Sequence, residues 1–378
     1  MKFIVQRQQL ISSVQNVMKA ISSRTAIPIL TGMKIDATAN GITLTGSDSD
    51  ISIESFIPAE EDGMVNAEQI EAGSVVLQAR YFPDIVRKLP ENTVEIEADE
   101  SFNVTIQSGK AKFNLNGQDA SEYPQLPVLQ TENSFEIQSD LLRNLIRQTV
   151  FAVSAMETRP ILTGVNIKVD NDTLYFTATD SHRLALRSIP LEGVTLNMPN
   201  IVVPGKSLNE LNKILDDKGE KVEISVTNNQ IMFRTKHLNF LSRLLDGNYP
   251  ETSRLIPDQS QTTLHIKTKE LINTIDRASL LAREERNNVV KLTTQDSQIL
   301  QITSNSPEVG QVAEEITVES LEGEDLKISF SSKYMLDALK AIESDEVLIK
   351  FTGAMRPFII RPVDDDSILQ LILPVRTY

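Results

Sequence analysis

The sequence predicts an α+β protein that consists of three tandem copies of one domain, each made of a sheet and two helices. A strand pattern followed by a helical pattern occurs three times, starting at Phe3, Phe135 and Leu264. Shorter motifs return at spacings of 126 to 132 residues. The matching segments are Pro-Ile-Leu-Thr-Gly at 28–32 and 160–164, Thr45–Ser49 and Thr177–Ser181, and Tyr123-Pro124 and Tyr249-Pro250.

A repeat of this length has the size of a compact domain, whereas the units of solenoid proteins are roughly 20 to 50 residues long. We therefore expect domains at residues 1–125, 129–255 and 259–378. Pro-rich and polar stretches near residues 124–133 and 250–262 mark the expected boundaries between them.

Each copy is expected to run strand, helix, strands, helix, strands. The helical periodicity places the opening helices near residues 7–21, 139–153 and 268–283, and the second helices within 79–89, 205–215 and 331–342. Polar and apolar residues alternate at 41–45, 94–97, 103–106, 222–226 and 347–351. Such alternation predicts antiparallel strands with one face toward water.

Composition narrows the class of protein. The chain has 378 residues, no cysteine and a formal net charge of −15. No disulfide, thiolate metal site or thiol catalysis is therefore expected. No apolar run has the length of a membrane span, and the first residues lead directly into a strand pattern rather than a signal peptide. These features are typical of a cytoplasmic protein.

Basic residues concentrate in the predicted helices. In the second helices the order base, acid four residues on, base seven residues on occurs three times: Arg80, Asp84, Arg87; Lys206, Glu210, Lys213; and Lys333, Asp337, Lys340. Residues with this spacing share one helix face. A chain that is acidic overall thus carries 15 basic and 6 acidic residues in six helical windows, which are residues 7–24, 79–89, 139–153, 205–215, 268–283 and 331–342. This partition indicates a surface for a polyanion, and a solvated, internally salt-bridged face is the alternative.

No pattern indicates an enzyme, a cofactor or a metal. The three histidines lie far apart, and the nucleotide-binding glycine motifs are missing. Asp180-Ser181-His182 contains the residue types of a catalytic triad, but a triad is a spatial arrangement rather than a run of neighbours. Asp364-Asp365-Asp366 is expected to be a hairpin tip rather than a cation site. The largely apolar ending at residues 371–378 either completes the last sheet or lines a docking groove.

The motifs taken together resemble the bacterial replicative sliding clamps, the beta subunit family of DNA polymerase III. The resemblance covers the whole chain. It is carried by Pro28–Leu30, Ala178–Ala185, Asp246–Pro250 and the Leu-Pro-Val-Arg segment at 373–376. It implies a DNA clamp fold and a head-to-tail homodimer that forms a ring around duplex DNA. Polymerases, the clamp loader and repair factors would dock by a short peptide motif into one pocket per chain.

The resemblance also implies roles for residues at matching positions. The partner-peptide pocket would comprise Arg159, Leu162, Thr179, His182, Arg183, Leu184, Pro250, Arg254, Leu255, Tyr334, Leu371, Pro374, Val375 and Arg376. The four leucines would form an apolar floor, and Tyr334, His182, Arg183 and Arg376 would stand at the rim. Some members have Gly at position 181 and Met at positions 373 and 375.

Two further sets follow from the resemblance. The residues facing DNA would be Arg24, Arg80, Arg87, Arg143, Arg147, Lys206, Lys213, Arg277, Lys333 and Lys340. The dimer interface would comprise Lys110, Lys112, Phe113, Leu115, Leu280 and Leu281, with Glu308, Glu314 or Glu315 opposite the lysines. Two other hypotheses remain at this point: a peptide-binding adaptor that does not bind DNA, and an enzyme that uses Asp180-Ser181-His182.

Overall fold

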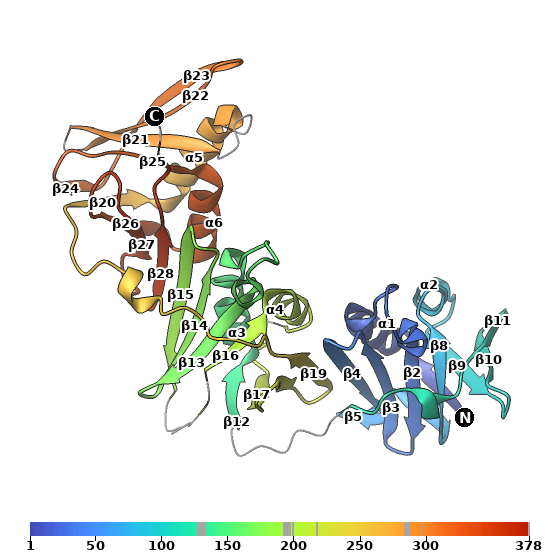
Figure 1. Ribbon diagram of the computed structural model, residues 1–378. Coiled ribbons are helices and arrows are strands. Elements are labelled where there is room, and N and C mark those ends of the chain that lie inside the picture. Colours follow the sequence, from blue (N-terminus) through green and yellow to red (C-terminus); the bar gives the residue numbers. More distant parts are fainter. Residues whose placement is uncertain are drawn as a thin grey trace. The chain divides into compact units, whose positions relative to one another are not determined.

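The computed structural model describes residues 1–126, 134–191, 198, 200–216, 218–282, 288–296 and 298–376 (Figure 1). Its contacts group the chain into two compact units, Met1–Asp140 with Lys213–Leu244 and Leu141–Asn212 with Leu245–Tyr378. Both units contain antiparallel sheets with helices packed against them, which confirms the predicted α+β class. Within the described ranges, no helix is long and apolar enough to cross a membrane.

The first unit contains two large sheets. One has the strand order β11 (Ala111–Asn116), β10 (Asn103–Ser108), β9 (Thr93–Ala98), β1 (Lys2–Gln6), β7 (Ala67–Glu71). The other has the order β12 (Ser134–Gln138), β17 (Lys221–Val226), β18 (Gln230–Arg234), β19 (Leu238–Arg243), β4 (Ile51–Pro58), β3 (Gly41–Ser47), β2 (Gly32–Thr38), β8 (Gly73–Gln78). This unit also contains a small hairpin of β5 (Glu60–Glu61) and β6 (Met64–Val65). Its α-helices are α1 (Arg7–Val17) and α2 (Phe82–Lys88).

The second unit also contains two sheets. The larger has the order β16 (Ile201–Pro204), β13 (Gly164–Asp170), β14 (Thr173–Thr179), β15 (Arg183–Pro190), β28 (Ile368–Ile372), β27 (Phe358–Pro362), β26 (Glu346–Phe351), β20 (Thr262–Lys267), β24 (Ser320–Gly323). The smaller has the order β23 (Gly310–Thr317), β22 (Ile299–Ser306), β21 (Val289–Asp296), β25 (Lys327–Ser331). The remaining helices are α3 (Ser139–Arg147), α4 (Gly205–Asn212), α5 (Thr268–Ala282) and α6 (Ser332–Ile342).

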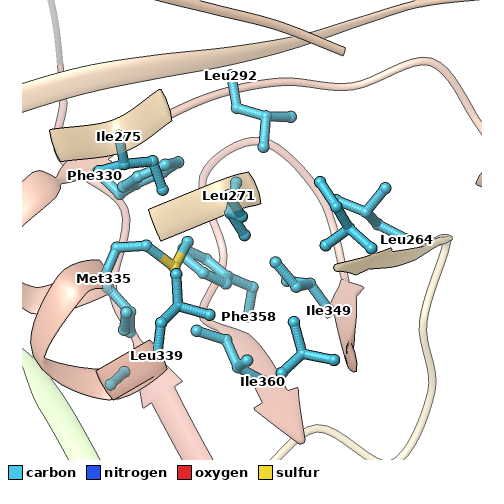
Figure 2. Packing of buried hydrophobic residues seen from close by; sticks show 14 of the residues in the cluster. Leu264, Leu271, Ile275, Leu292, Phe330, Met335, Leu339, Ile349, Phe358 and Ile360 are labelled. Carbon is cyan, nitrogen blue, oxygen red and sulfur yellow. The ribbon is translucent and has the colours of Figure 1, made fainter. Parts of the chain in front are cut away.

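The helices form where an apolar stripe meets a sheet. In the third copy, Leu271 and Ile275 of α5 face Met335 and Leu339 of α6, with Phe358 of β27 packed into the same core (Figure 2). All five side chains are at most 1 % exposed. Burial of such side chains contributes about 1.5–3 kcal/mol each, which exceeds the intrinsic helix preference of any one residue.

The helices are shorter than the periodicity predicts. The first and third α-helices end at Val17 and Arg147, and the chain then continues in the tighter 3₁₀ turns Met18–Ala20 and Val150–Ala152. The helix α2 begins at Phe82, because Pro83 lacks an N–H and fits only the first turn. Arg80 and Lys213 therefore lie outside the helices in which the sequence pattern placed them.

The sheets continue from one repeat copy into the next. Strand β19 of the second copy pairs with β4 of the first, and β28 of the third copy pairs with β15 of the second. The two pairings have the same register, since Leu238 opposite Ser55 corresponds to Ile368 opposite Arg187. This continuity explains why three repeat copies make two compact units. The strand β28 also shows that the apolar C-terminal segment begins as part of a sheet.

Candidate docking site

The turn between β14 and β15 is shaped by the side chain of Asp180. Its Oδ1 accepts hydrogen bonds from the amides of His182 (2.9 Å) and Arg183 (3.0 Å), and Ser181 has a φ of 77°. The first copy repeats this geometry with Asp48, which accepts from the amides of Asp50 (3.1 Å) and Ile51 (2.9 Å). Aspartate favours such turns because its short carboxylate satisfies nearby backbone amides. The Asp180-Ser181-His182 segment thus has a structural role.

Arg183 is buried among three acceptors. Its guanidinium donates to Asp180 Oδ2 (3.0 Å), Asp337 Oδ2 (2.7 Å) and the Phe151 carbonyl (2.7 Å). The residue is only 7 % exposed, and its expected place at the pocket rim stays a prediction. An arginine can be buried in this way when its donors are paired with charged and carbonyl oxygens.

Two aromatic rings connect Arg183 to the surface. The Arg183 guanidinium carbon lies 4.5 Å from the centre of the Tyr334 ring, and Tyr334 is stacked with His182 at 6.5 Å between ring centres. Partial burial raises the pKa of Tyr334, and the Asp180 carboxylate acts in the same direction. The contact with Arg183 therefore restricts the orientation of Tyr334, and both aromatic residues line a cavity.

The segment after β28 forms the opposite wall. The amide of Leu373 donates to the His182 carbonyl (2.9 Å), and the amide of Val375 donates to the Ser329 carbonyl (2.8 Å). Between these walls lies a cavity of about 340 Å³. It is lined by His182, Asn288, Ser331, Lys333, Tyr334, Pro374 and Val375.

Four of the residues predicted for the pocket line this cavity: His182, Tyr334, Pro374 and Val375. Sequence reasoning missed Asn288, Ser331 and Lys333. Ser331 caps α6, because its hydroxyl accepts a hydrogen bond from the Tyr334 amide (3.4 Å). A serine directly before a predicted helix is a typical capping residue, so the sequence could have placed Ser331 close to the predicted pocket residue Tyr334. Lys333 had been assigned to the DNA-facing set, although it lies at the cavity and donates to Asp337 (2.8 Å).

The four leucines predicted to form the pocket floor do not line this cavity, so their role stays a prediction. Leu184 and Leu371 are opposite each other in the β15–β28 pair and are 1 % exposed, within an apolar cluster that Leu373 covers. Leu162 is also buried, whereas Leu255 is 51 % exposed. The remaining predicted residues do not line the cavity. Thr179 is buried in the turn, Arg159 donates to Ser181 Oγ (3.4 Å), and Pro250, Arg254 and Arg376 are exposed.

Several basic residues predicted to face DNA are paired within the chain. Arg87 pairs with Asp84, Arg147 with Glu343 and Arg277 with Glu314. Arg143, Lys206 and Lys213 also interact with other residues of the chain. Arg24, Arg80 and Lys340 are exposed, and the Arg80 guanidinium lies 5.3 Å from the centre of the Tyr81 ring. Part of the positive charge expected from the sequence is therefore balanced locally.

The residues predicted for the dimer interface lie in or directly before the edge strand β11 and on the helix α5. Phe113 and Leu115 belong to β11, which pairs only with β10 among the described strands, and Phe113 is 39 % exposed. Leu280 and Leu281 are on α5, which packs against β22 and β23 (Figure 1). Leu280 is 59 % exposed. Phe113 and Leu280 are thus large apolar side chains that are exposed in the single chain.

Three family models of the DNA polymerase III beta subunit match consecutive parts of the chain. The N-terminal domain matches residues 1–127, the central domain 136–251 and the C-terminal domain 253–376. Together with the repeated fold, these matches define a DNA sliding clamp of the bacterial type. The chain belongs to the DNA polymerase III beta subunit family.

Individual relatives agree with this assignment. The chain is 59 % identical to the beta sliding clamp of Bacillus subtilis and 50 % identical to that of Staphylococcus aureus, with both chains fully covered in each comparison. It is similar to the crystal structure of the Bacillus subtilis DNA polymerase sliding clamp, with a TM-score of 0.96 and full coverage of both chains. The Pseudomonas aeruginosa clamp bound to griselimycin, 26 % identical, gives 0.93, again with full coverage of both chains.

The turn beside the cavity yields a stability prediction. The amide of Thr179 donates to the hydroxyl of Tyr249 (3.0 Å), and Thr179 is 5 % exposed. Tyr249→Phe would leave this amide without its acceptor, so urea unfolding should show a loss of about 1–3 kcal/mol. Tyr81→Phe, at a side chain that is 49 % exposed, should change stability by less than about 0.5 kcal/mol. Equal stabilities of the two variants would contradict this role of Tyr249.

Proposed function

We propose that this protein forms a head-to-tail homodimeric ring around duplex DNA and tethers polymerases and other replication and repair proteins, including the clamp loader, through the docking cavity. It acts without catalysing a reaction, in the cytoplasm where the chromosome lies. Family membership supports the clamp activity. Ring formation is supported by the two edge strands β11 and β23. In the repeat β11 corresponds to β19 and β28, and β23 corresponds to β4 and β15, which pair with them within the chain.

The internal junctions supply the expected register between chains. Phe113 corresponds to Phe240, because Ile106–Phe113 and Phe233–Phe240 are equivalent cross-strand pairs. Phe240 is opposite Ile53 of β4.

On the other edge, Ile53 corresponds to Val312, because Gly46–Ile53 and Ser304–Val312 are equivalent pairs. Phe113 is therefore expected opposite Val312 of the partner chain. Three positions further along, Lys110 meets Glu315.

The side chains at these edges fit such a pairing. Val312 is partly buried against the core of its own copy, on the same face of β23 as Glu314 and Ile316. Phe113 would cover the exposed part of Val312 and remove apolar surface from water. Glu314 is already held by Arg277 (2.9 Å), so Glu315 is the acid available directly opposite a lysine.

The cavity suits a short extended peptide. Tyr334 and His182 offer ring faces, Pro374 and Val375 offer apolar contacts, and Lys333 and Ser331 offer polar ones. A partner segment with glutamine followed by leucine and an aromatic residue would place its apolar side chains between the two walls. Sites of this kind concentrate binding energy in a few well-packed contacts.

The exposed basic residues suit a ligand that must slide. Contacts from Arg24, Arg80 and Lys340 to phosphate groups carry no sequence information and exchange easily along the backbone. The ion pairs elsewhere on the helices keep the attraction moderate. The acidic remainder of the chain disfavours DNA at other surfaces.

Ring formation is tested at the apolar edge residues. The double variant Phe113→Ala, Leu280→Ala should be a folded monomer at micromolar concentration. Both side chains are exposed in the single chain, so their truncation removes contacts that form only in the dimer. Native mass measurement checks the monomeric state, and an unfolding curve checks that the variant is folded. Met156→Ala with Met355→Ala, at side chains that are 66 % and 56 % exposed, is the control and should remain dimeric. A dimeric Phe113/Leu280 variant would show that the interface lies elsewhere.

Docking is tested by removing the wall of the cavity. Deletion from Pro374 onward removes one observed backbone hydrogen bond, Val375 to Ser329, and leaves β28 intact. The truncated protein should remain a folded dimer and bind a fluorescent partner peptide at least tenfold more weakly, since the loss of a central contact costs about 2 kcal/mol or more. Deletion of residues 377–378 alone is the control. Unchanged peptide affinity after the longer deletion would exclude this cavity as the docking site.

The proposed contact with DNA is tested by reversing the charge of three exposed basic residues. Replacing Arg24, Arg80 and Lys340 by Glu should slow loading onto primed circular DNA, with an effect that shrinks as salt rises. Thermal stability should change little, because exposed charges contribute about 0–1 kcal/mol each. The control has the same charge change at Lys218, Lys327 and Arg356. If both triple variants load equally at low salt, the predicted DNA-facing surface is wrong.

A further inference from the structure

The backbone arrangement beside the docking cavity occurs a second time, at the junction between the first and second copies. In the second copy, the amide of Leu373 donates to the carbonyl of His182 in the turn between β14 and β15 (2.9 Å). At the equivalent place in the first copy, the amide of Arg243 donates to the carbonyl of Asp50 in the turn between β3 and β4, also at 2.9 Å. The residues around the first-copy turn belong to one compact unit.

A cavity of about 220 Å³, here called the first-copy cavity, lies beside this turn. One difference between the copies explains the space. In the second copy Leu184 is opposite Leu371 and both are buried, whereas in the first copy Ser52 is opposite Leu241. Ser52 and Leu241 both line the cavity. A serine is much smaller than a leucine, so part of the volume that a leucine fills in the second copy stays open in the first.

The lining of the first-copy cavity includes exposed apolar surface. Leu30 and Leu241 are 2 % and 6 % exposed, whereas Ile27 at the same cavity is 42 % exposed. Sites for small-molecule ligands usually have about 300–1,000 Å³, so a cavity of this smaller size suits one apolar side chain of a partner. A side chain that covers Ile27 removes apolar surface from water, which favours binding.

Three polar side chains at this cavity are available to a ligand. Arg243, directly after the last pairs of β19 with β4, is opposite Gln230 of β18, so the two side chains share a face of the sheet. Asp50 also lines the cavity. Within the ranges that the structure describes, none of these three side chains forms a hydrogen bond or an ion pair. The donors of Arg243 and Gln230 suit a carboxylate, and the carboxylate of Asp50 suits a cation.

We propose that the first-copy cavity is a second docking site, which binds an internal segment of a partner protein with an aliphatic residue between an acid and a base. The aliphatic side chain enters the cavity and covers Ile27. The acid pairs with Arg243 beside Gln230, and the base pairs with Asp50. A free C-terminus is a poorer match, because it brings a carboxylate without a cation for Asp50.

The two sites differ in specificity. The first-copy cavity has Asp50 at the position of His182 and Arg243 at the position of Leu373. A peptide with glutamine followed by leucine and an aromatic residue offers no charge to Asp50 or Arg243, so it does not serve both sites. Docking at the first-copy cavity requires neither the ring nor the cavity beside His182, and one chain can hold two different partner segments.

The probes are two fluorescein-labelled peptides, blocked at both ends, with the central sequences Ser-Glu-Leu-Lys-Ser and Ser-Lys-Leu-Glu-Ser. In anisotropy titrations with the full chain, at least one of them should bind with a Kd below about 1 mM. Arg243→Glu should weaken this binding at least tenfold, because it places a carboxylate near the acid of the peptide. Arg356→Glu makes the same charge change at another exposed residue and should bind like the parent.

A charge swap separates ion pairing from a change of structure. When the Glu of the bound probe is replaced by Lys, the Arg243→Glu variant should bind it more tightly than the parent does. Ser52→Leu should weaken binding of the original probe at least tenfold, because the leucine fills the cavity. This change also removes the hydrogen bond between the Ser47 and Ser52 hydroxyls (2.8 Å), so its fold is checked by an unfolding curve. The exposed Arg243 variant decides the test if Ser52→Leu does not fold.

The outcomes separate the first-copy site from the proposed docking cavity. Binding of neither probe to the parent, or equal binding to the parent and to Arg243→Glu, would overturn the inference. Deletion from Pro374 onward should leave probe binding unchanged, and a loss of binding after this deletion would show that the probe occupies the cavity beside His182 instead. If the glutamine-leucine-aromatic peptide fails to bind the parent while a probe binds, the proposed function is contradicted and the first-copy site is supported.

Discussion

A strand at the edge of a sheet presents a row of N–H and C=O groups that must be hydrogen-bonded by water or by another strand. In this protein β4 and β15 satisfy these groups with β19 and β28, which come from the following repeat copy. The cavity beside His182 depends on that arrangement. Because β28 lies beside β15, the segment that follows it runs past His182, and the Leu373 amide reaches the His182 carbonyl. Without this pairing, the positions of the two cavity walls relative to each other would not be fixed.

Much of the fold is predictable from the sequence because its determinants are local. The alternation at 41–45, 94–97 and 222–226 lies within β3, β9 and β17, and the helical stripes lie on α3, α5 and α6. The helix ends were less well predicted, since Pro83 and the 3₁₀ turns act at single residues. The continuation of sheets between copies was not predicted at all. Periodicity shows that a strand has a buried face, but it does not specify which strand lies at its edge.

The site shows where reasoning from residue types fails. Tyr334, His182, Pro374 and Val375 were identified through the resemblance, and the cavity contains them. The resemblance also places Arg183 at the rim, whereas its guanidinium donates to two carboxylates and a carbonyl and is largely buried. Lys333 was placed with the DNA-facing residues because its spacing matches Arg80 and Lys206. Equivalent positions in a repeat share backbone geometry, while their neighbours differ.

The turn made by Asp48 and Asp180 shows what such sharing implies for the origin of binding sites. In both copies an aspartate holds the same bend, with Ser49 at a φ of 79° and Ser181 at 77°. Only the second copy has histidine, arginine and leucine in the next three positions, where the first has aspartate, isoleucine and serine. After duplication, then, a recognition site could arise by changing side chains on an inherited backbone, without the loss of stability that a new loop would bring. The first copy has this backbone without the histidine, arginine and leucine, and it offers a location for grafting a second specificity into the same molecule.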